Sequence, residues 1–126
     1  MFNAICWLFF VLTSCNVQNK SLIITGADQT RKYLPYLEGK NVAMTVNHSS
    51  FIGEKHSLDS LVSLGVKVVK VFGPDHGCRG NASDGAPIGN DIDEKTGVPV
   101  ISLYADHYKP TPEDMAGVDV MIYDIR

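Results

Sequence analysis

The sequence lacks an apolar run that is long enough to cross a bilayer as a helix. The run near its start, from Ile5 to Leu12, has eight residues, whereas a membrane-spanning helix needs ~20. The sequence also lacks a basic cluster, because its formal net charge is −3 and no basic stripe is interleaved with aromatic residues. These are not the electrostatic features of a nucleic-acid-binding protein, so we expect no nucleic acid among its partners.

Lysine and arginine are absent from the first fifteen residues. The short apolar run is nevertheless typical of the central part of a secretory signal, and Leu12-Thr13-Ser14-Cys15 resembles a bacterial lipobox. We therefore predict a lipoprotein-type signal peptide over residues 1–14, lipidation of Cys15 and a tether over residues 15–22. A lipid anchor would hold the protein in the cell envelope, as a periplasmic or outer-membrane lipoprotein. A general signal peptide with an incidental cysteine is the alternative.

Cysteine is scarce, with three residues in the chain. Cys6 would leave with the signal peptide and Cys15 would carry lipid. Cys78 would then be the only thiol of the mature chain, so no intramolecular disulfide is expected even in an oxidising compartment.

Common ligand-binding motifs are also missing. Residues 73–80 contain no Gly-Lys-Ser/Thr, and G-x-G-x-x-G is absent, so neither nucleotide-binding loop is present. Asp91 and Asp93 lack the central glycine and the closing glutamate of an EF-hand loop. The four histidines form no H-E-x-x-H or paired-cysteine pattern. We therefore expect neither a metal ion nor a cofactor.

Residues 23–126 have the length of one domain in which apolar strands alternate with short helices. Such alternation predicts an α/β fold with a Rossmann-like parallel sheet and helices on both faces. A further helix is expected from Thr111, where a hydroxyl N-cap precedes Pro112. Two other helices are predicted, from Asp28 to Leu37 and from His56 to Leu64, and Pro35 should end or kink the first of them. The four predicted strands are Lys40 to Val46, Lys67 to Phe72, Pro99 to Tyr104 and Asp119 to Ile125.

The most informative segment is the glycine-rich turn that follows the second predicted strand, V-F-G-P-D-H-G-C-R-G. Ligands of open parallel sheets bind just outside the carboxyl ends of the strands, and the crossover rule puts those ends on one edge. We therefore expect six side chains to share one neighbourhood there: His48, Asp75, His76, Arg79, His107 and Asp124. A charged surface turn without chemistry is the alternative.

The chain stops where its last predicted strand ends. No helix follows to cover that strand, and an uncovered apolar strand is an aggregation liability. The sequence therefore predicts a sheet that is truncated after its fourth strand and a domain, residues 23–126, that is incomplete. A small complete domain with its last strand on a protected edge is the alternative.

Several motifs, in their order and spacing along the chain, resemble those of the NamZ-type exo-β-N-acetylmuramidases, a family long catalogued as a domain of unknown function. The most specific are G-P-D-H-G-C-R-G at residues 73–80 and D-E-K-T-G-V-P-V-I-S-L-Y at residues 93–104. The others are V-N-H-S-S at residues 46–50, N-A-S-D-G-A at 81–86, K-P-T-P-E-D at 109–114 and the closing strand. The resemblance runs from about Thr25 to Arg126, which would be the N-terminal portion of such an enzyme.

The resemblance implies a glycoside hydrolase that releases N-acetylmuramic acid from the non-reducing ends of peptidoglycan fragments, with muramyl saccharides as its partners. It implies Asp75 as the catalytic acid, where the family usually has Glu. We predict Asn47, His76, Arg79 and Asp124 as substrate-binding residues, with Arg79 pairing the lactyl carboxylate of muramic acid.

Two departures from the family pattern affect this interpretation. A change from Glu to Asp retracts the carboxylate by about one methylene, and a misplacement of that size can cost ~10²-fold in rate. The family chain also continues far beyond the position of Arg126. The resemblance therefore implies a truncated enzyme and leaves open whether this chain is active. The alternative is a non-catalytic envelope lipoprotein that at most binds sugar.

Overall fold

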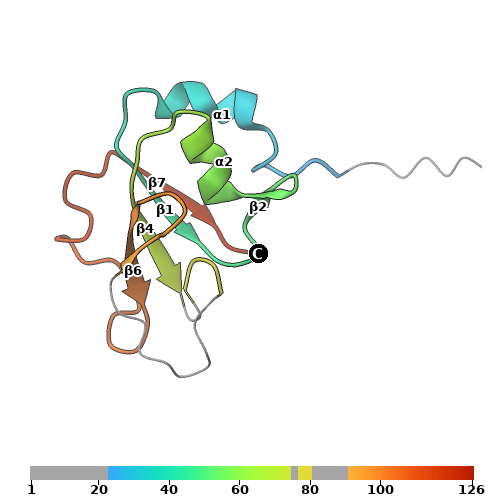
Figure 1. The fold of residues 1–126 in the computed structure, drawn as a ribbon. Coiled ribbons are helices and arrows are strands. Elements are labelled where there is room, and N and C mark those ends of the chain that lie inside the picture. Colours follow the sequence, from blue (N-terminus) through green and yellow to red (C-terminus); the bar gives the residue numbers. More distant parts are fainter. Residues whose placement is uncertain (1–22, 75–76, 81–90) are drawn as a thin grey trace, which may run out of the picture.

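The structure is a computed structural model that describes residues 23–74, 77–80 and 91–126. Its main sheet has five strands in the order β5-β6-β4-β1-β7. Strand β1 pairs in parallel with β4 and β7, β4 pairs in parallel with β6, and only the short β5 runs antiparallel. These strands are β1 (Val42–Val46), β4 (Val68–Pro74), β5 (Asp91–Ile92), β6 (Pro99–Leu103) and β7 (Val120–Asp124) (Figure 1).

Two helices and a small hairpin complete the described structure. Helix α1 (Thr30–Leu37) precedes β1, and helix α2 (Ser57–Ser63) precedes β4. The hairpin pairs β2 (Phe51–Ile52) with β3 (Lys55–His56) between β1 and α2. Neither helix of the described chain is long and apolar enough to cross a membrane.

The register divides the sheet into two faces. Along β1 the residues Val42, Met44 and Val46 point to one side, and Ala43 and Thr45 point to the other, because strand side chains alternate. All five are buried, as expected for a central parallel strand that is covered on both sides. We call the side of Met44 the helix face and the side of Thr45 the open face.

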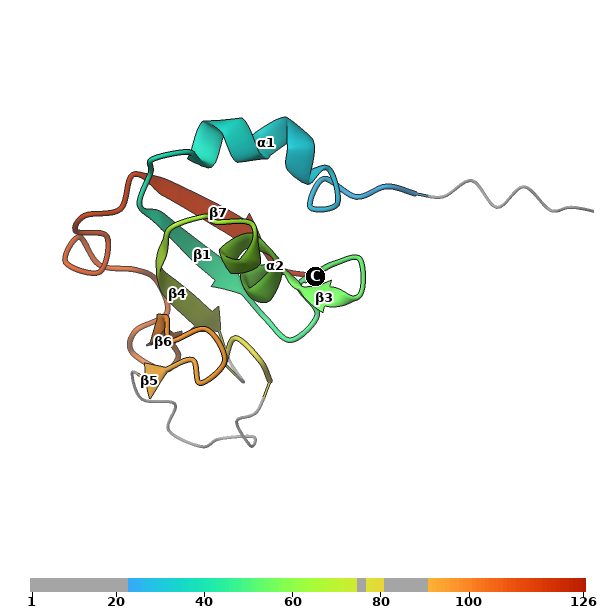
Figure 2. The same cartoon turned by 45° about the horizontal axis from the view of Figure 1, so that its top comes forward.

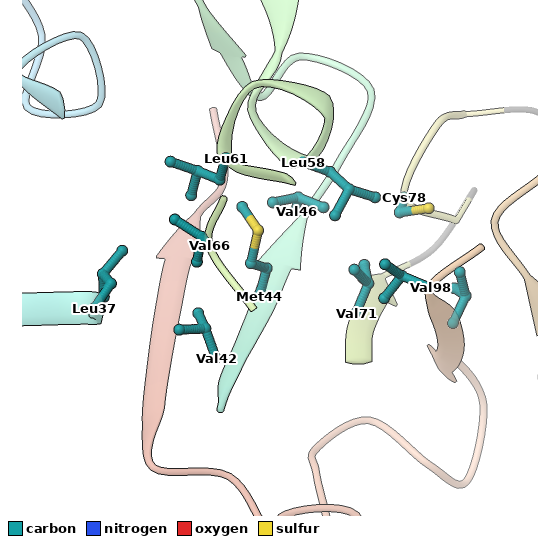
Figure 3. Close-up of a cluster of buried hydrophobic side chains, with 11 residues drawn as sticks. Leu37, Val42, Met44, Val46, Leu58, Leu61, Val66, Val71, Cys78 and Val98 are labelled. Carbon is teal, nitrogen blue, oxygen red and sulfur yellow. The ribbon is translucent and has the colours of Figure 1, made fainter. Parts of the chain in front are cut away.

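The helix face carries the hydrophobic core. Leu37 of α1 and both Leu58 and Leu61 of α2 belong to one buried cluster with Met44 and Val71 of the sheet (Figure 3). The turned view in Figure 2 shows the two helices on the same side of the sheet. Each fully buried leucine side chain contributes roughly 1.5–3 kcal/mol to the hydrophobic stabilisation, so this side holds the fold together.

The connection between β6 and β7 lies next to the open face. Lys70 of β4 is on this face, and its ammonium group donates a hydrogen bond to the carbonyl of Asp114 in that connection. A helix is predicted from Thr111, but turns are observed. The hydroxyl of Thr111 accepts a hydrogen bond from the Asp114 amide at 3.2 Å, as an N-cap does, and the Asp114 carboxylate accepts one from the Thr111 amide in return. Gly117, at a φ of +75°, ends the turns before a helix can continue.

The α/β class, the parallel sheet and the four predicted strands are confirmed. Both described helices lie on the helix face, so the open face has turns where the sequence predicts a helix. Helix α1 continues for two residues past Pro35 instead of ending there. Strand β7 lies at the edge of the sheet, beside β1.

Candidate functional site

A cavity of about 620 Å³ lies on the open face, at the carboxyl ends of the parallel strands. This is the position at which open parallel sheets bind ligands. Strand residues form its floor, the loops after β1 and β4 form one wall, and the β6–β7 connection forms another. The lining residues are Thr45, Asn47, His48, Pro74, Gly77, Leu103, Tyr108, Lys109, Pro110, Met121, Tyr123 and Ile125.

Asn47 begins the loop after β1 and organises it. Its side-chain carbonyl accepts hydrogen bonds from the Ser49 amide at 3.2 Å and the Ser50 hydroxyl at 3.0 Å. Its side-chain amide donates to the carbonyl of Arg126 at 3.1 Å. The structure therefore places Asn47 at the cavity, as expected, with its side chain engaged in the turn; its contact with a substrate stays a prediction.

His56 joins the loops after β1 and β4. Its Nε2 lies 2.9 Å from the carbonyl oxygen of Asn47 and 3.1 Å from that of Cys78. The imidazole is buried and its Nδ1 has no hydrogen-bond partner among the described residues. The sequence offered no signal for this role, because His56 is a single histidine at a helix start.

The glycine-rich turn packs directly against the loop after β1. Gly80 has a φ of +71°, and a Cβ atom on it would lie 2.8 Å from the Cβ of His48. A Cβ on Gly73 would lie 2.7 Å from the backbone nitrogen of Cys78. A side chain at Gly80 would push the turn away from the loop after β1, and one at Gly73 would disrupt the turn itself, so both positions require glycine.

Arg79 lies in an ion cluster on the α2 side of this turn. One guanidinium nitrogen donates to Asp59 at 2.7 Å and to Asp93 at 2.8 Å, and Nε donates to Asp93 as well. Lys95 forms a further ion pair with Asp59. The two carboxylate side chains are 4% exposed, so the cluster ties α2, the turn and residues 93–95 together beneath the surface.

The cluster shifts the pKa values of its members. The hydrogen bond from Arg79 is the main cause that lowers the pKa of Asp93 to about 2, against the opposing effect of burial. Burial raises the pKa of Asp59, but the hydrogen bonds from Arg79 and Lys95 outweigh it and the net shift is downward. The bonds with Asp93 raise the pKa of Arg79. All three groups are therefore charged at neutral pH.

Arg79 is thus paired with two carboxylates before any substrate arrives. The sequence predicts that it binds the lactyl carboxylate, and that role stays a prediction. The predicted Asp75 and His76 lie outside the described residues. The residues on either side of them, Pro74 and Gly77, line the cavity.

Asp124 lies on the helix face, across from Val46 in the register. It lines a second cavity of about 360 Å³ with Tyr33 and Leu61, and not the cavity of the open face. One carboxylate oxygen lies 3.1 Å from Nε of Arg126, and the other is buried without a hydrogen-bond partner in the described part of the chain. Asn47 and Asp124 therefore belong to different cavities.

His107 pairs with Asp114 within the β6–β7 connection, at 2.7 Å. The backbone hydrogen bond from Thr111 is the main cause that lowers the pKa of Asp114, and His107 lowers it further.

Among residues 23–74, 77–80 and 91–126, no three His, Cys, Asp or Glu side chains gather as metal ligands would.

The structure is that of an α/β protein with a cavity at the carboxyl edge of a Rossmann-like sheet. Residues 42–126 match the family model of the N-terminal part of the exo-beta-N-acetylmuramidase NamZ. The chain belongs to this family. It is 41% identical over 113 residues to the peptidoglycan beta-N-acetylmuramidase NamZ of Bacillus subtilis (strain 168), which covers 85% of this chain and 27% of that protein.

Two crystal structures of DUF1343 family proteins from Bacteroides fragilis share the fold. One is 42% identical with a TM-score of 0.66 and covers 82% of this chain. The other is 35% identical with a TM-score of 0.64 and covers 77% of this chain. The aligned part is 25% and 24% of those two chains, respectively, so this chain spans about a quarter of the length of its relatives.

Proposed function

We propose that this chain forms the sugar-binding edge of an exo-acting β-N-acetylmuramidase, a glycoside hydrolase that releases N-acetylmuramic acid from the non-reducing ends of peptidoglycan fragments. The observation that carries the proposal is the cavity of about 620 Å³ at the carboxyl edge of the sheet, in a chain 41% identical to a peptidoglycan beta-N-acetylmuramidase. The volume lies within the ~300–1,000 Å³ of ordinary ligand sites.

Asp75 is the proposed catalytic acid. Glycoside hydrolysis uses two carboxyl groups, one of which protonates the leaving oxygen. The described residues that line the cavity include no carboxylate, and Asp59 and Asp93 are paired with Arg79. Asp75 lies in sequence between Pro74 and Gly77, which both line the cavity. Asp124 also lies in sequence between two lining residues, Tyr123 and Ile125, but its side chain lines the second cavity. Asp75 is therefore the acid that we propose for this cavity, with His76 as its neighbour.

Turnover of a chromogenic N-acetylmuramic acid glycoside by the 126-residue chain tests this function. We expect slow release of the chromophore, abolished in Asp75→Asn and increased in Asp75→Glu, because glutamate extends the carboxylate by about one methylene. Undiminished turnover in Asp75→Asn would contradict the assignment. Binding of N-acetylmuramic acid without turnover would favour the alternative, a non-catalytic relative that binds sugar.

Attachment to the cell envelope is proposed through lipid on Cys15. One acyl chain gives only marginal membrane binding, and several give a stable anchor. Labelling of cells with a radioactive fatty acid should mark the wild-type protein and not Cys15→Ala. Equal label in both proteins would contradict the anchor.

A further inference from the structure

The described residues that line the open-face cavity differ in charge from the ion cluster around Arg79. They include one cationic side chain, Lys109, and no aspartate or glutamate. His48 is the one histidine among them. This described lining favours an anionic group on the ligand, because a lysine faces the cavity and none of these residues repels negative charge.

Lys109 has no carboxylate partner in the part of the chain that the structure describes. The ammonium nitrogen of Lys109 lies over the ring of Tyr108, 5.9 Å from the ring centroid. Arg79 differs, because two buried carboxylates already bind its guanidinium. Of these two cations, Lys109 is the one that is free to pair with a ligand.

The backbone on either side of Lys109 is held in place. His107 contacts the carboxylate of Asp114 at 2.7 Å, and the amide of Thr111 donates to the same carboxylate at 2.8 Å. Pro110 fixes its own φ between these anchors. The lysine is therefore presented from a short, pinned segment, which reduces the entropy that binding would cost.

Two aromatic side chains give the same cavity an apolar surface. Tyr108 and Tyr123 line it, yet they are 73% and 74% exposed. Large exposed rings around a cavity are typical of ligand sites, where an apolar body and a polar tip are both used. The C–H face of a pyranose ring offers a matching apolar surface.

We propose that Lys109 determines specificity for the carboxylate of the lactyl group of muramic acid, while the tyrosines contact the sugar ring. The proposal rests on the proposed function and deepens it, because it names the residue that separates N-acetylmuramic acid from N-acetylglucosamine, the same ring without the lactyl group. Lysine acts here as a point charge. The pair is exposed to water, so we expect a preference of roughly threefold to fivefold.

Titrations of the 126-residue chain with each sugar, followed by amide chemical shifts, test the proposal. We expect N-acetylmuramic acid to bind about threefold to fivefold more tightly than N-acetylglucosamine, with a smaller ratio at high salt. Lys109→Met should reduce the ratio to about one and leave the affinity for N-acetylglucosamine unchanged, and Lys109→Arg should restore part of it. Lys67→Met, an exposed lysine at the opposite edge of the sheet, should leave the ratio intact.

The results separate this proposal from the proposed function. If the chain binds both sugars and Lys109→Met keeps the preference, the role of Lys109 is overturned and the proposed function stands. If the wild-type chain binds neither sugar at millimolar concentration, both are overturned. If Lys67→Met removes the preference as fully as Lys109→Met, general charge and not position is responsible, and the proposal is again overturned.

Discussion

The two faces of the sheet use the same strands in opposite ways. On the helix face Met44, Leu58 and Leu61 exclude water and form the core. On the open face Thr45 and Tyr123 line the cavity of about 620 Å³, whereas the cavity of the helix face has about 360 Å³. The core and the larger cavity are therefore separated by the alternation of side chains along the strands, so that a substitution on one face can leave the other intact.

Charge follows the same division. Arg79 lies among the buried carboxylates of Asp59 and Asp93, which fix the glycine-rich turn to α2. Lys109 projects from the β6–β7 connection without a described carboxylate partner. Arg79 is engaged in ion pairs that join parts of the fold, whereas Lys109 has no such pair among the described residues. The following predictions test this contrast between the faces.

The largest loss of stability is expected from Arg79→Met. Removing the guanidinium would leave the buried carboxylate of Asp93 without an ion pair and that of Asp59 with Lys95 alone, and breaking a buried ion pair from one side costs roughly 3–5 kcal/mol in the free energy of unfolding. Urea unfolding followed by circular dichroism measures the loss. Lys109→Met is the matched control and should change the value by less than about 0.5 kcal/mol. Equal effects of the two substitutions would remove the contrast between the cations.

Leu58→Ala should destabilise the helix face by roughly 2–5 kcal/mol, because it leaves a cavity where a fully buried side chain packs. Leu64→Ala offers a control at the end of the same helix, where the leucine is 52% exposed. We expect the control to lose less than about 1 kcal/mol. The same urea titration compares them, and similar losses would show that the core does not lie where the structure has it.

Acid should weaken the protein through Asp93. Its pKa is 3.8 in the unfolded chain and about 2 in the folded one, so the unfolded state binds more protons between these values. The stabilisation is therefore fully present above about pH 4 and is lost as the pH falls towards about 2, by about 2 kcal/mol at most. In Asp93→Asn the free energy of unfolding, measured by urea titration at several pH values in this range, should depend less on pH than in the wild type. An unchanged slope in that variant would place the acid sensitivity elsewhere.

The smallest effect on stability is expected from Tyr123→Ser. Its side chain is 74% exposed on the open face, so the free energy of unfolding should change by less than about 0.5 kcal/mol. Ile122→Ala, at the neighbouring position on the helix face, should cost more. Both sugars should bind the Tyr123 variant more weakly by the same factor, because the ring would contact what they share. A selective loss of one sugar would contradict that role.

The sequence predicted the parallel strands well because short apolar runs rich in β-branched residues, bounded by glycine, proline or aspartate, favour strands. It missed β5 and the β2–β3 hairpin, since two-residue strands have no periodicity to detect. It also predicted a helix at Thr111 from correct capping residues, and the Thr111 hydroxyl does accept the expected hydrogen bond from the Asp114 amide. Gly117 ends the turns there, so a sound start signal was not sufficient for a helix.

The sequence by itself determined the α/β class, the four parallel strands and the edge at which their loops meet. Local hydrophobic patterns and the handedness of crossovers are enough for that. Only the tertiary structure decided that Asp124 and Asn47 line different cavities. It also decided that Arg79 has carboxylate partners from α2 and from the turn that precedes β6. These partners are 20 and 14 residues away along the chain. A charged side chain takes its partner from what the fold brings near it, and no local pattern contains that information.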